Sequence, residues 1–588
     1  MSNEEKRINK VHAPYNFVPF SNSILFPYDT ADDLPSHGEW DATRKTGEIE
    51  IRMKAETPVF VSDGDKDNPS FFRTPAGKLA LPGSTIRGMV RENMQILGFG
   101  LVREEDVGDT QIFFREIAAG KGSAARRLKE YYDIAMGLKP QEDETKAELE
   151  TASTQRGVRA GYLRKEGERY RIIPTQGQPL GAYFRISRKD ELAQPFRNKY
   201  TQSMEVFYRE HGGTVTALRW AQGDCPKGMK HGFLLLTGKA VNINSIYLFP
   251  DPAPAAKGIP LKEKDVIAYD EDWERRKNVL KPAEFWELPK KDGAEGQKPV
   301  FYLEDGEHVY WGMTRFLRIG HRYPLSYGLP KGQKKAAEAA EKDGRLDYPR
   351  AILGYAEDKK AYRSRVSFGD LEFDTGTAEE GEPVPMVLGE PKPSFYPGYA
   401  YGKNNTNAVR HYSDGDFQLR GYKLYWLKRE AKSPGGGKQS VTTTLRPLSK
   451  GATFRGVIRF KNLTEAELGL LLWSLRLDDN CFQSVGMGKP YGYGRMTLTI
   501  ERMAEYDPDS SYDGSLSPTW KEIDEETMKQ YIRIYDDAAC KALAEATNGN
   551  PKRSIRAYSE IQDFFYMKQT LHEADAATRA GVFLHEPG

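Results

Sequence analysis

Phe454-Arg-Gly-Val-Ile-Arg-Phe460 and Met496-Thr-Leu-Thr-Ile500 are two stretches of alternating polar and apolar residues, and together with the chain around them they indicate the fold class. Such alternation is typical of a β-strand that buries one face. Between them, Thr464-Glu-Ala-Glu467 has the spacing of a capping box, which predicts the start of a helix. The apolar face of this helix is formed by Leu468, Leu471, Leu472 and Leu475. The predicted order of strand, helix, loop and strand indicates an α+β protein.

The loop before the second strand is Gly486-Met-Gly-Lys-Pro-Tyr-Gly-Tyr-Gly494, followed by Arg495. Its glycines, Gly486, Gly488, Gly492 and Gly494, allow positive φ angles and a close approach of a ligand to the main chain. In an RNA-binding interpretation, backbone N–H groups, Lys489 and Arg495 bind phosphate, while Tyr491 and Tyr493 stack on bases. The alternative is a glycine-rich hairpin without a ligand.

A second candidate site is the start of a helix at Leu81-Pro-Gly-Ser-Thr85. Ser84 or Thr85 is the expected N-cap residue. The unpaired N–H groups at Gly83, Ser84 and Thr85 and the helix dipole suit a phosphate group, and Arg87 and Arg91 lie one turn apart to continue the contact. The alternative is a core helix with two solvated arginines.

A third candidate is the acidic loop Ser62-Asp-Gly-Asp-Lys-Asp-Asn-Pro69. Its carboxylates, Asp63, Asp65 and Asp67, fall within five residues, and carboxylates at this spacing can bind a hard divalent cation that polarises a phosphate. The alternative is a solvated turn, because Asp, Gly and Asn are turn-forming residues.

Composition limits the possible functions. The 588 residues include 86 basic and 84 acidic side chains, so the net charge is only +2 and any polyanion site must be local. Three distant cysteines without a CxxC pair argue against a disulfide scaffold and a cysteine-built zinc site, and they suit a reducing cytoplasm. No apolar run approaches membrane-spanning length, so we expect a cytoplasmic protein without a membrane partner.

The nine histidines are scattered, and no pair has the spacing of metal ligands. A histidine-based acid–base ribonuclease therefore lacks an obvious centre. His321, in the basic and aromatic stretch Arg318-Ile-Gly-His-Arg-Tyr-Pro324, is the best candidate for an RNA contact. A structural histidine is the alternative.

Together, three of these stretches resemble the RAMP superfamily of CRISPR effector proteins, and the chain looks like a type III backbone subunit. The acidic loop up to Pro69, the helix start Pro82-Gly-Ser-Thr-Ile-Arg-Gly88 and the glycine loop occur in the order that marks the superfamily. Arg363-Ser-Arg-Val-Ser-Phe-Gly-Asp370 also resembles the arginine-led strand of these proteins. The similar stretches cover less than a fifth of the sequence but bracket most of it.

The resemblance implies a modified RNA-recognition, ferredoxin-like core, in which helices pack on one face of an antiparallel sheet. Since such cores are much shorter than this chain, we expect one core with insertions; a tandem pair of cores is the alternative. The predicted organisation is an extended lead-in at 1–45, a discontinuous core at 46–505 with insertions near 100–230, 250–300 and 325–350, and a mainly helical tail at 506–588.

For function, the resemblance implies a subunit that binds guide crRNA, leaves the guide bases free to pair with target RNA and contacts other CRISPR effector subunits. The family places its nucleolytic aspartate in the acidic loop, where Asp67 matches. Asp67 is therefore the predicted catalytic residue and ligand of Mg²⁺ or another divalent cation, with Asp63 and Asp65 as neighbours. The alternatives are a non-cleaving RNA-binding scaffold and a precursor-processing ribonuclease.

Overall fold

A computed structural model provides the structure of the protein. The residues that it describes are 13–65, 68–108, 110–118, 122–139, 157–196, 199, 201–237, 244–278, 280–357, 360–376, 379–389, 392–403, 405–432, 435, 442–507 and 519–571.

The centre of the molecule is an antiparallel sheet built around β2 (Lys45–Ala55). Strand β29 (Arg495–Asp507) pairs with one edge of β2 and β27 (Thr453–Leu463) with the other. On its far edge β27 pairs with β18 (Val366–Phe368) and β19 (Leu371–Phe373). The sheet is completed by β3 (Ala80–Leu81), β28 (Gln483–Ser484) and β30 (Thr519–Glu522).

Two helices make the crossovers of this sheet. Helix α1 (Gly83–Leu97) connects β2 to β18 and β19, and α9 (Glu465–Arg476) connects β27 to β29. The order of elements is therefore βαββαβ, and the strand order β29-β2-β27-β19 places the fourth and third strands beside the first. This is the ferredoxin-like arrangement. The predicted α+β fold with an antiparallel sheet, and the predicted strand, helix and strand at 454–500, are confirmed.

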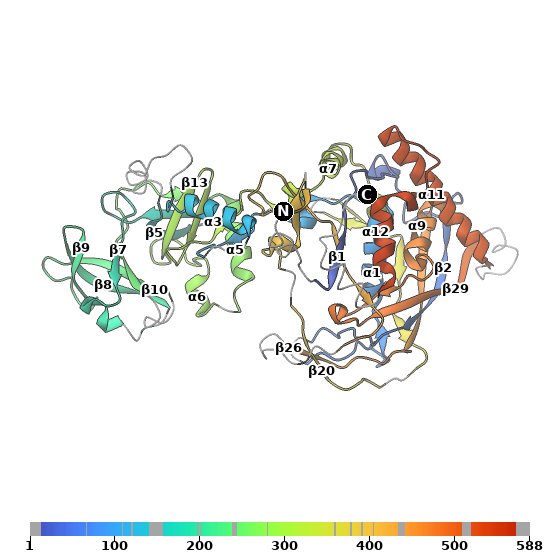
Figure 1. Cartoon of the computed structure of the whole chain (residues 1–588), viewed down its shortest axis with the longest axis horizontal. Helices are drawn as coiled ribbons and strands as arrows, with labels where there is room; N and C mark the ends of the chain where they lie inside the picture. The colour runs from blue at the N-terminus through green and yellow to red at the C-terminus, as the bar shows by residue number, and fades with distance from the viewer. Residues whose placement is uncertain are drawn as a thin grey trace, which may run out of the picture.

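The helices and the sheet share one hydrophobic core. Ile49, Ile51 and Met53 of β2 are buried on the helix side, where they join the apolar stripe of α1. Most residues of helix α9 are buried, because α11 (Glu525–Thr547) covers its outer face (Figure 1). Gly469 permits this contact, since a Cβ there would lie 2.0 Å from the carbonyl oxygen of Tyr531. A further C-terminal helix, α12 (Ser559–Lys568), packs against α1.

Most of the long segment between α1 and β18 forms a second lobe. We name it the insertion lobe and define it as residues 113–320 (Figure 1). One of its sheets takes strands from both the insertion predicted near 100–230 and the one predicted near 250–300; in sheet order it contains β12 (Ile259–Pro260), β6 (Arg169–Pro174), β5 (Arg159–Glu166), β13 (Lys298–Asp305) and β14 (His308–Gly312). The other contains β7 (Phe184–Ser187), β11 (Ser245–Pro250), β10 (Lys230–Leu236), β8 (Gln202–His211) and β9 (Thr214–Trp220).

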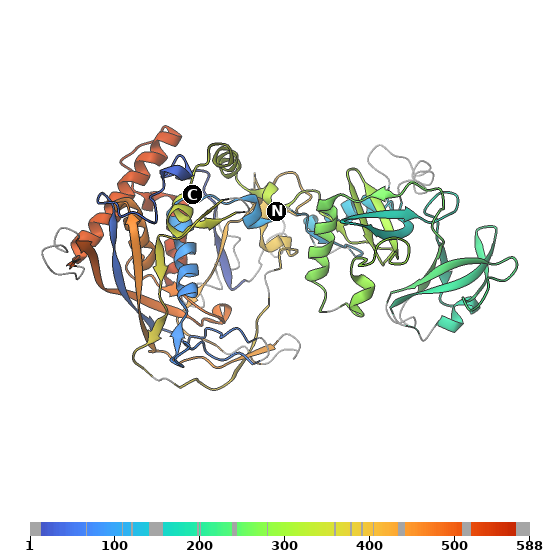
Figure 2. The same cartoon turned by 180° about the vertical axis from the view of Figure 1, so that it is seen from behind.

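The insertion lobe joins the rest of the molecule, the core lobe, through a narrow neck (Figure 2). Strand β4 (Phe113–Phe114) enters the lobe, β15 (Ile319–Gly320) leaves it, and the two pair with each other. Among the described residues of the lobe, the helices are α3 (Ser123–Ala135), η3 (Glu191–Phe196), α5 (Glu263–Glu274) and α6 (Ala283–Trp286).

The remaining elements surround the central sheet. Strand β1 (Tyr15–Val18), within the predicted lead-in, pairs with β24 (Tyr422–Tyr425). The segment from 325 to 362 contains η5 (Leu325–Gly328), α7 (Lys331–Asp343), α8 (Tyr348–Leu353), β16 (Tyr355–Ala356) and β17 (Ala361–Tyr362). Between β19 and β27 lie β20 (Val384–Val387), η6 (Tyr396–Gly398), β21 (Ala400–Gly402), β22 (Asn405–Val409), β23 (Phe417–Leu419), β25 (Leu427–Lys428) and β26 (Thr442–Leu445). Short elements elsewhere are η2 (Ala31–Asp33), α2 (Glu104–Val107), η8 (Lys489–Tyr491), η9 (Ile555–Ala557) and β31 (Thr570–Leu571). Across the described ranges, none of the helices combines the length and the apolar character needed to span a membrane.

Candidate nucleic-acid interface

The start of α1 is built differently from the sequence expectation. The helix begins at Gly83, and Pro82 occupies the N-cap position, so the predicted cap at Ser84 or Thr85 was wrong. Gly83 is required because a Cβ there would lie 2.2 Å from the carbonyl oxygen of Phe368. The Gly83 N–H donates a 2.8 Å hydrogen bond to Asp370 Oδ1, so a carboxylate already occupies one donor of this helix end.

In front of this helix start lies a depression of about 690 Å³. It is lined by the beginning of α1 and by the segment from Arg363 to Phe368, which contains β18. This strand lies beside α1 in Figure 2. Among the described residues that line it there is no Asp or Glu. Its cationic side chains are Arg87, Arg363, Arg365, Arg459 and Lys461. His37 also lines the depression; burial, with a further contribution from the charge of Arg363, lowers its pKa.

A second depression of about 660 Å³ continues from the first, since Arg87, Arg363 and Ser364 line both. It adds Arg91, Arg103 and Arg350. Its acidic residues are mostly engaged in the protein: Glu357 pairs with Arg350 at 2.5 Å and Arg103 at 3.3 Å, while Asp347 accepts the backbone N–H groups of Leu101 and Arg350. We name the two depressions together the basic groove.

The cations of the basic groove differ in how far they are free to bind a ligand. Arg87 and Arg91 are exposed on α1, and the only hydrogen bond of Arg87 within the described residues is to the carbonyl oxygen of Leu353, at 2.8 Å. Arg363 is exposed as well. Arg459 lies 3.6 Å from a carboxylate oxygen of Glu48, and Lys461 donates to a backbone carbonyl. An anionic ligand in the groove would thus meet three exposed arginines near the start of α1.

Arg365 has a structural role instead. Its guanidinium is buried and forms a two-pronged ion pair with Glu467, including an Nη1–Oε2 distance of 2.9 Å. It also donates to the carbonyl oxygens of Ala351 and Asn462, so it ties α8 and the end of β27 to the start of α9.

Three aromatic side chains lie at or beside the basic groove. Trp520 lines the groove and is 38% exposed, and Trp40 is 43% exposed. Their rings contact Tyr506 between them, at centroid distances of 6.0 and 6.2 Å. Sequence analysis missed this trio because its members come from three separate segments. The only local signal was a tryptophan within a polar stretch, which by itself carries little information.

The outer face of the central sheet is less suited to bases. RNA-recognition sheets stack bases on exposed aromatic residues, but β2 contains none. Its outward residues are charged and paired with neighbouring strands: Arg52 lies 3.0 Å from Glu501, and Glu48 and Glu50 each lie 3.0 Å from Arg502. This balance of charge favours the basic groove over the sheet face as the site for a polyanion.

The glycine loop packs tightly against the protein. Its glycines all have positive φ angles, and added Cβ atoms at Gly486 and Gly494 would lie 2.1 and 1.8 Å from backbone oxygens. Tyr493 is buried, and Tyr491 donates its hydroxyl hydrogen to the carbonyl oxygen of Val387. Arg495 is also buried, which lowers its pKa, and it donates to Thr570 Oγ1. Lys489, the other side chain of this stretch that was predicted to bind phosphate, lines a small pocket.

The structure brings the acidic loop and the glycine loop together. Phe60, just before the acidic loop, accepts the N–H of Met487 at 2.9 Å, and Pro58 accepts the N–H of Gly494 at 2.9 Å. In the acidic loop, Asp63 Oδ1 accepts the N–H groups of Asp65 and Ser70, as in a turn, and both aspartates are exposed. Asp67 lies outside the described residues, so its predicted role has no structural account.

His321 lies away from these sites. It is almost completely buried, its Nδ1 is 3.1 Å from Ser413 Oγ, and burial lowers its pKa. Its ring stacks on Phe114 at a centroid distance of 4.3 Å. This environment suits a packing role at the neck of the insertion lobe.

Comparison with known proteins gives one family match. Residues 52–129 match the model of the RAMP superfamily, a stretch that contains part of β2, the acidic loop and all of α1. No curated protein matches the chain. The matched stretch supplies the first strand and first helix of the ferredoxin-like core, and with them Arg87 and Arg91 of the basic groove. This chain therefore carries a segment similar to the RAMP superfamily at residues 52–129.

Proposed function

We propose that this protein binds guide crRNA as a backbone subunit of a type III CRISPR effector complex. The observation that carries the proposal is the basic groove, which collects exposed arginines at the start of α1 in a chain of almost neutral net charge. The match of residues 52–129 to the RAMP superfamily supports an RNA-binding role linked to CRISPR. The type III role rests on the motif resemblance alone.

In this proposal Arg87, Arg91 and Arg363 bind consecutive phosphates of the guide. Asp370 caps the Gly83 N–H, so the phosphate contact at the helix end falls to the Ser84 side chain and Arg87. Bases beside the groove stack on Trp520 and Trp40, each contributing about 1–3 kcal/mol. Sequence specificity then comes from pairing between guide and target RNA, as in other guided systems. Other effector subunits would continue the same RNA path on either side.

The test is RNA binding by wild type and by Arg87→Ala/Arg363→Ala over a series of salt concentrations. The double variant should bind more weakly, and its plot of log affinity against log salt should be flatter by about 1.4, from about 0.7 for each phosphate contact on a single strand. Arg126→Ala is the matched control, because Arg126 is an exposed arginine on α3 in the insertion lobe. Identical slopes for all three proteins would contradict the groove. Sequencing of co-purified RNA should find repeat-derived guides.

Metal-dependent cleavage of target RNA is the second candidate function. It is favoured by the exposed carboxylates of Asp63 and Asp65 and by the contact between their hairpin and the glycine loop. However, no group of three metal-ligating side chains occurs among the described residues, so binding of Mg²⁺ or another divalent cation would need Asp67.

Asp67→Ala distinguishes an enzyme from a scaffold. In the assembled, guide-loaded complex this variant should bind complementary RNA normally but cleave it far more slowly, and chelation of divalent cations should stop cleavage by wild type. Asp63→Ala is the comparison, because Asp63 Oδ1 accepts turn hydrogen bonds. A wild-type complex that binds target and never cuts would leave only the scaffold function.

A further inference from the structure

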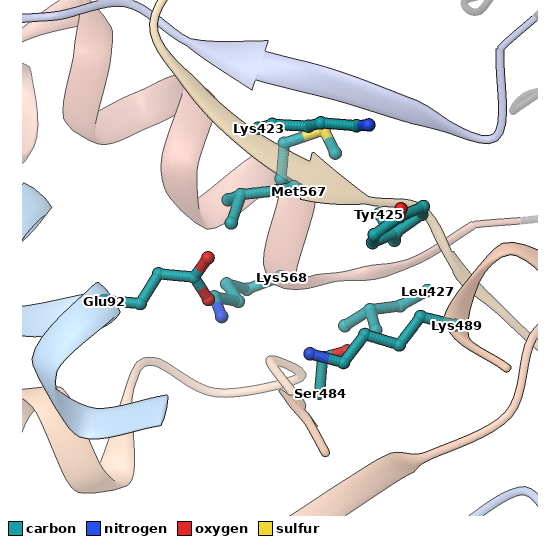
Figure 3. A pocket seen from close by; sticks show the side chains of 9 residues that line it. Glu92, Lys423, Tyr425, Leu427, Ser484, Lys489, Met567 and Lys568 are labelled. Atoms are coloured by element: carbon teal, nitrogen blue, oxygen red, sulfur yellow. The ribbon is translucent and has the colours of Figure 1, made fainter. Parts of the chain in front are cut away.

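A small pocket beside α1 is drawn in Figure 3, and it shares no lining residue with the basic groove. It is enclosed by α1, β24, the glycine loop and the end of α12, and its volume is about 80 Å³. A water molecule takes about 30 Å³ of liquid volume. The pocket therefore has room for one small group but not for a nucleobase with its ribose.

Lys568, the last residue of α12, is the unusual feature of this pocket. It is only 3% exposed, and burial lowers the pKa of its ammonium group. Within the described ranges, the ammonium forms no hydrogen bond and no ion pair within 4 Å. It lies 5.3 Å from the centroid of the Phe564 ring, and the charges of Glu92 and Lys489 act on it with opposite effects on its pKa. A buried ammonium without a hydrogen bond is costly even with a carboxylate in the same pocket, so this group points to a ligand that accepts its hydrogen bonds.

Two further donors face the same space. Ser484 Oγ is buried and has no hydrogen-bond partner among the described residues. In Figure 3 the ammonium group of Lys489 lies beside Ser484, and that of Lys568 extends into the pocket toward the carboxylate of Glu92. Glu92 supplies the one negative charge of the described lining, so these groups leave the pocket with a net positive charge.

Lys423 also lines the pocket, but its ammonium group already has a hydrogen-bond partner and an aromatic contact within the protein. Its ammonium donates to Tyr399 Oη at 3.2 Å and lies 3.9 Å from the centre of the Tyr15 ring. Figure 3 shows it pointing away from Lys568 and Lys489. It is therefore the natural control position.

We infer that this pocket binds a single phosphate group through Lys568, Lys489 and Ser484. A phosphate offers several acceptor oxygens and a negative charge, which match two ammonium donors, one hydroxyl donor and the net positive charge of the site. Its size fits the volume of the pocket. The inference goes beyond the proposed RNA groove, because none of these three residues lines that groove.

The first test is the melting temperature of the full-length protein in inorganic phosphate and in sodium chloride of equal ionic strength. Phosphate should raise the melting temperature of wild type further than chloride does, since a ligand that binds only the folded state stabilises it. Lys568→Met should weaken phosphate binding about tenfold or more, as loss of a charged hydrogen bond does. It should also melt higher than wild type in the absence of phosphate, which a purely structural lysine would not do.

Lys489→Ala and Ser484→Ala give a second test that does not touch the buried lysine. Both should reduce the phosphate response, whereas Lys423→Met should keep it in full. An equal response of wild type to phosphate and chloride, or a full phosphate response in Lys568→Met, would overturn the inference.

The phosphate can come from RNA or from solution, and a competition experiment separates these sources. If it belongs to RNA, Lys568→Met should lower RNA affinity and inorganic phosphate should compete with RNA. If it is free phosphate, RNA affinity should be unchanged in Lys568→Met while the phosphate response is lost. Arg87→Ala/Arg363→Ala should keep the phosphate response in either case, so failure of the groove and failure of this pocket give different results.

Discussion

Gly494 illustrates how single residues of the glycine loop serve the fold. Its φ angle is +76°, and an added Cβ would lie 1.8 Å from the carbonyl oxygen of Val485. The loop can therefore reverse direction and still pair with the segment before the acidic loop. The glycine content that suggested ligand contact is explained, at this position, by contact between two parts of the backbone.

The prediction for this residue is a loss of stability. Gly494→Ala should lower the free energy of unfolding by several kcal/mol, because a positive φ costs about 1–3 kcal/mol and overpacking typically about 1–3 more. Gly88→Ala is the matched control: Gly88 is exposed inside α1 with no atom within 4 Å of an added Cβ, so the change should stabilise by about 1 kcal/mol. Urea unfolding of both variants measures the difference, and equal effects would contradict this account.

Arg365 and Glu467 form the buried ion pair that holds the start of α9. Arg365→Met should lower the free energy of unfolding by about 3–5 kcal/mol, because it removes the two-pronged partner of the buried Glu467 carboxylate and leaves it with the more distant Arg44, at 3.7 Å. Adding Glu467→Gln should recover part of this loss, which a double-mutant cycle in urea would measure. Strictly additive losses would mean that the pair is not coupled.

Residue positions differ in how well sequence indicates them. Arg87 and Arg91 follow a helix start, and their exposure on α1 follows from the apolar stripe on its other side. The burial of Tyr493 and Arg495 could not be predicted, because it depends on partners such as Thr57 and Thr570 that are far away in the chain. Local pattern carries no information on such contacts.

At the scale of elements, periodic stretches were predicted well and their ends less well. The strand, helix and strand at 454–500 follow from alternation, a capping box and a leucine face. The start of α1 was misplaced because its cap, Asp370, comes from a distant strand end rather than from the first turn. In the insertion lobe, β5 pairs with β13, which lies more than 130 residues further along the chain, so local pattern does not indicate which strands pair.

The segment between β22 and β23 makes a contact that should depend on pH. His411 is buried there beside His321, with ring centroids 6.2 Å apart. Burial lowers the pKa of His411 to about 4, assisted by Arg127 and Arg410 and opposed by Asp414. Its folded pKa is thus below the value of about 6.5 in an unfolded chain.

The sign of the pH effect follows from proton binding. Between pH 6.5 and 4 the unfolded chain binds a proton at this histidine and the folded protein does not, so the free energy of unfolding falls as the pH falls. The slope from this group is at most about 1.4 kcal/mol per pH unit. His411→Asn should flatten the profile between pH 6.5 and 5, where ordinary carboxylates stay ionised. Urea unfolding at each pH tests this; an unchanged profile would remove His411 as the cause.

At the scale of the whole molecule, the core lobe and the insertion lobe have separate hydrophobic clusters and are joined at a narrow neck. The cluster around the central sheet and its helices is separate from the clusters of the two insertion sheets. The chain enters and leaves the insertion lobe through β4 and β15, which pair with each other. Interfaces of this kind resemble those between domains, which often unfold separately.

We therefore expect scanning calorimetry to resolve more than one unfolding transition. Since the basic groove lies entirely in the core lobe, RNA should raise the temperature of one transition and leave the other unchanged, by the linkage between binding and folding. Gly494→Ala should lower the same transition that RNA raises, which assigns it independently to the core lobe. In Arg87→Ala/Arg363→Ala the RNA-induced shift should shrink while both transitions stay where they are without RNA. A single transition that RNA moves as a whole would mean that the neck transmits stability between the lobes, and the two lobes would have to be treated as one cooperative unit.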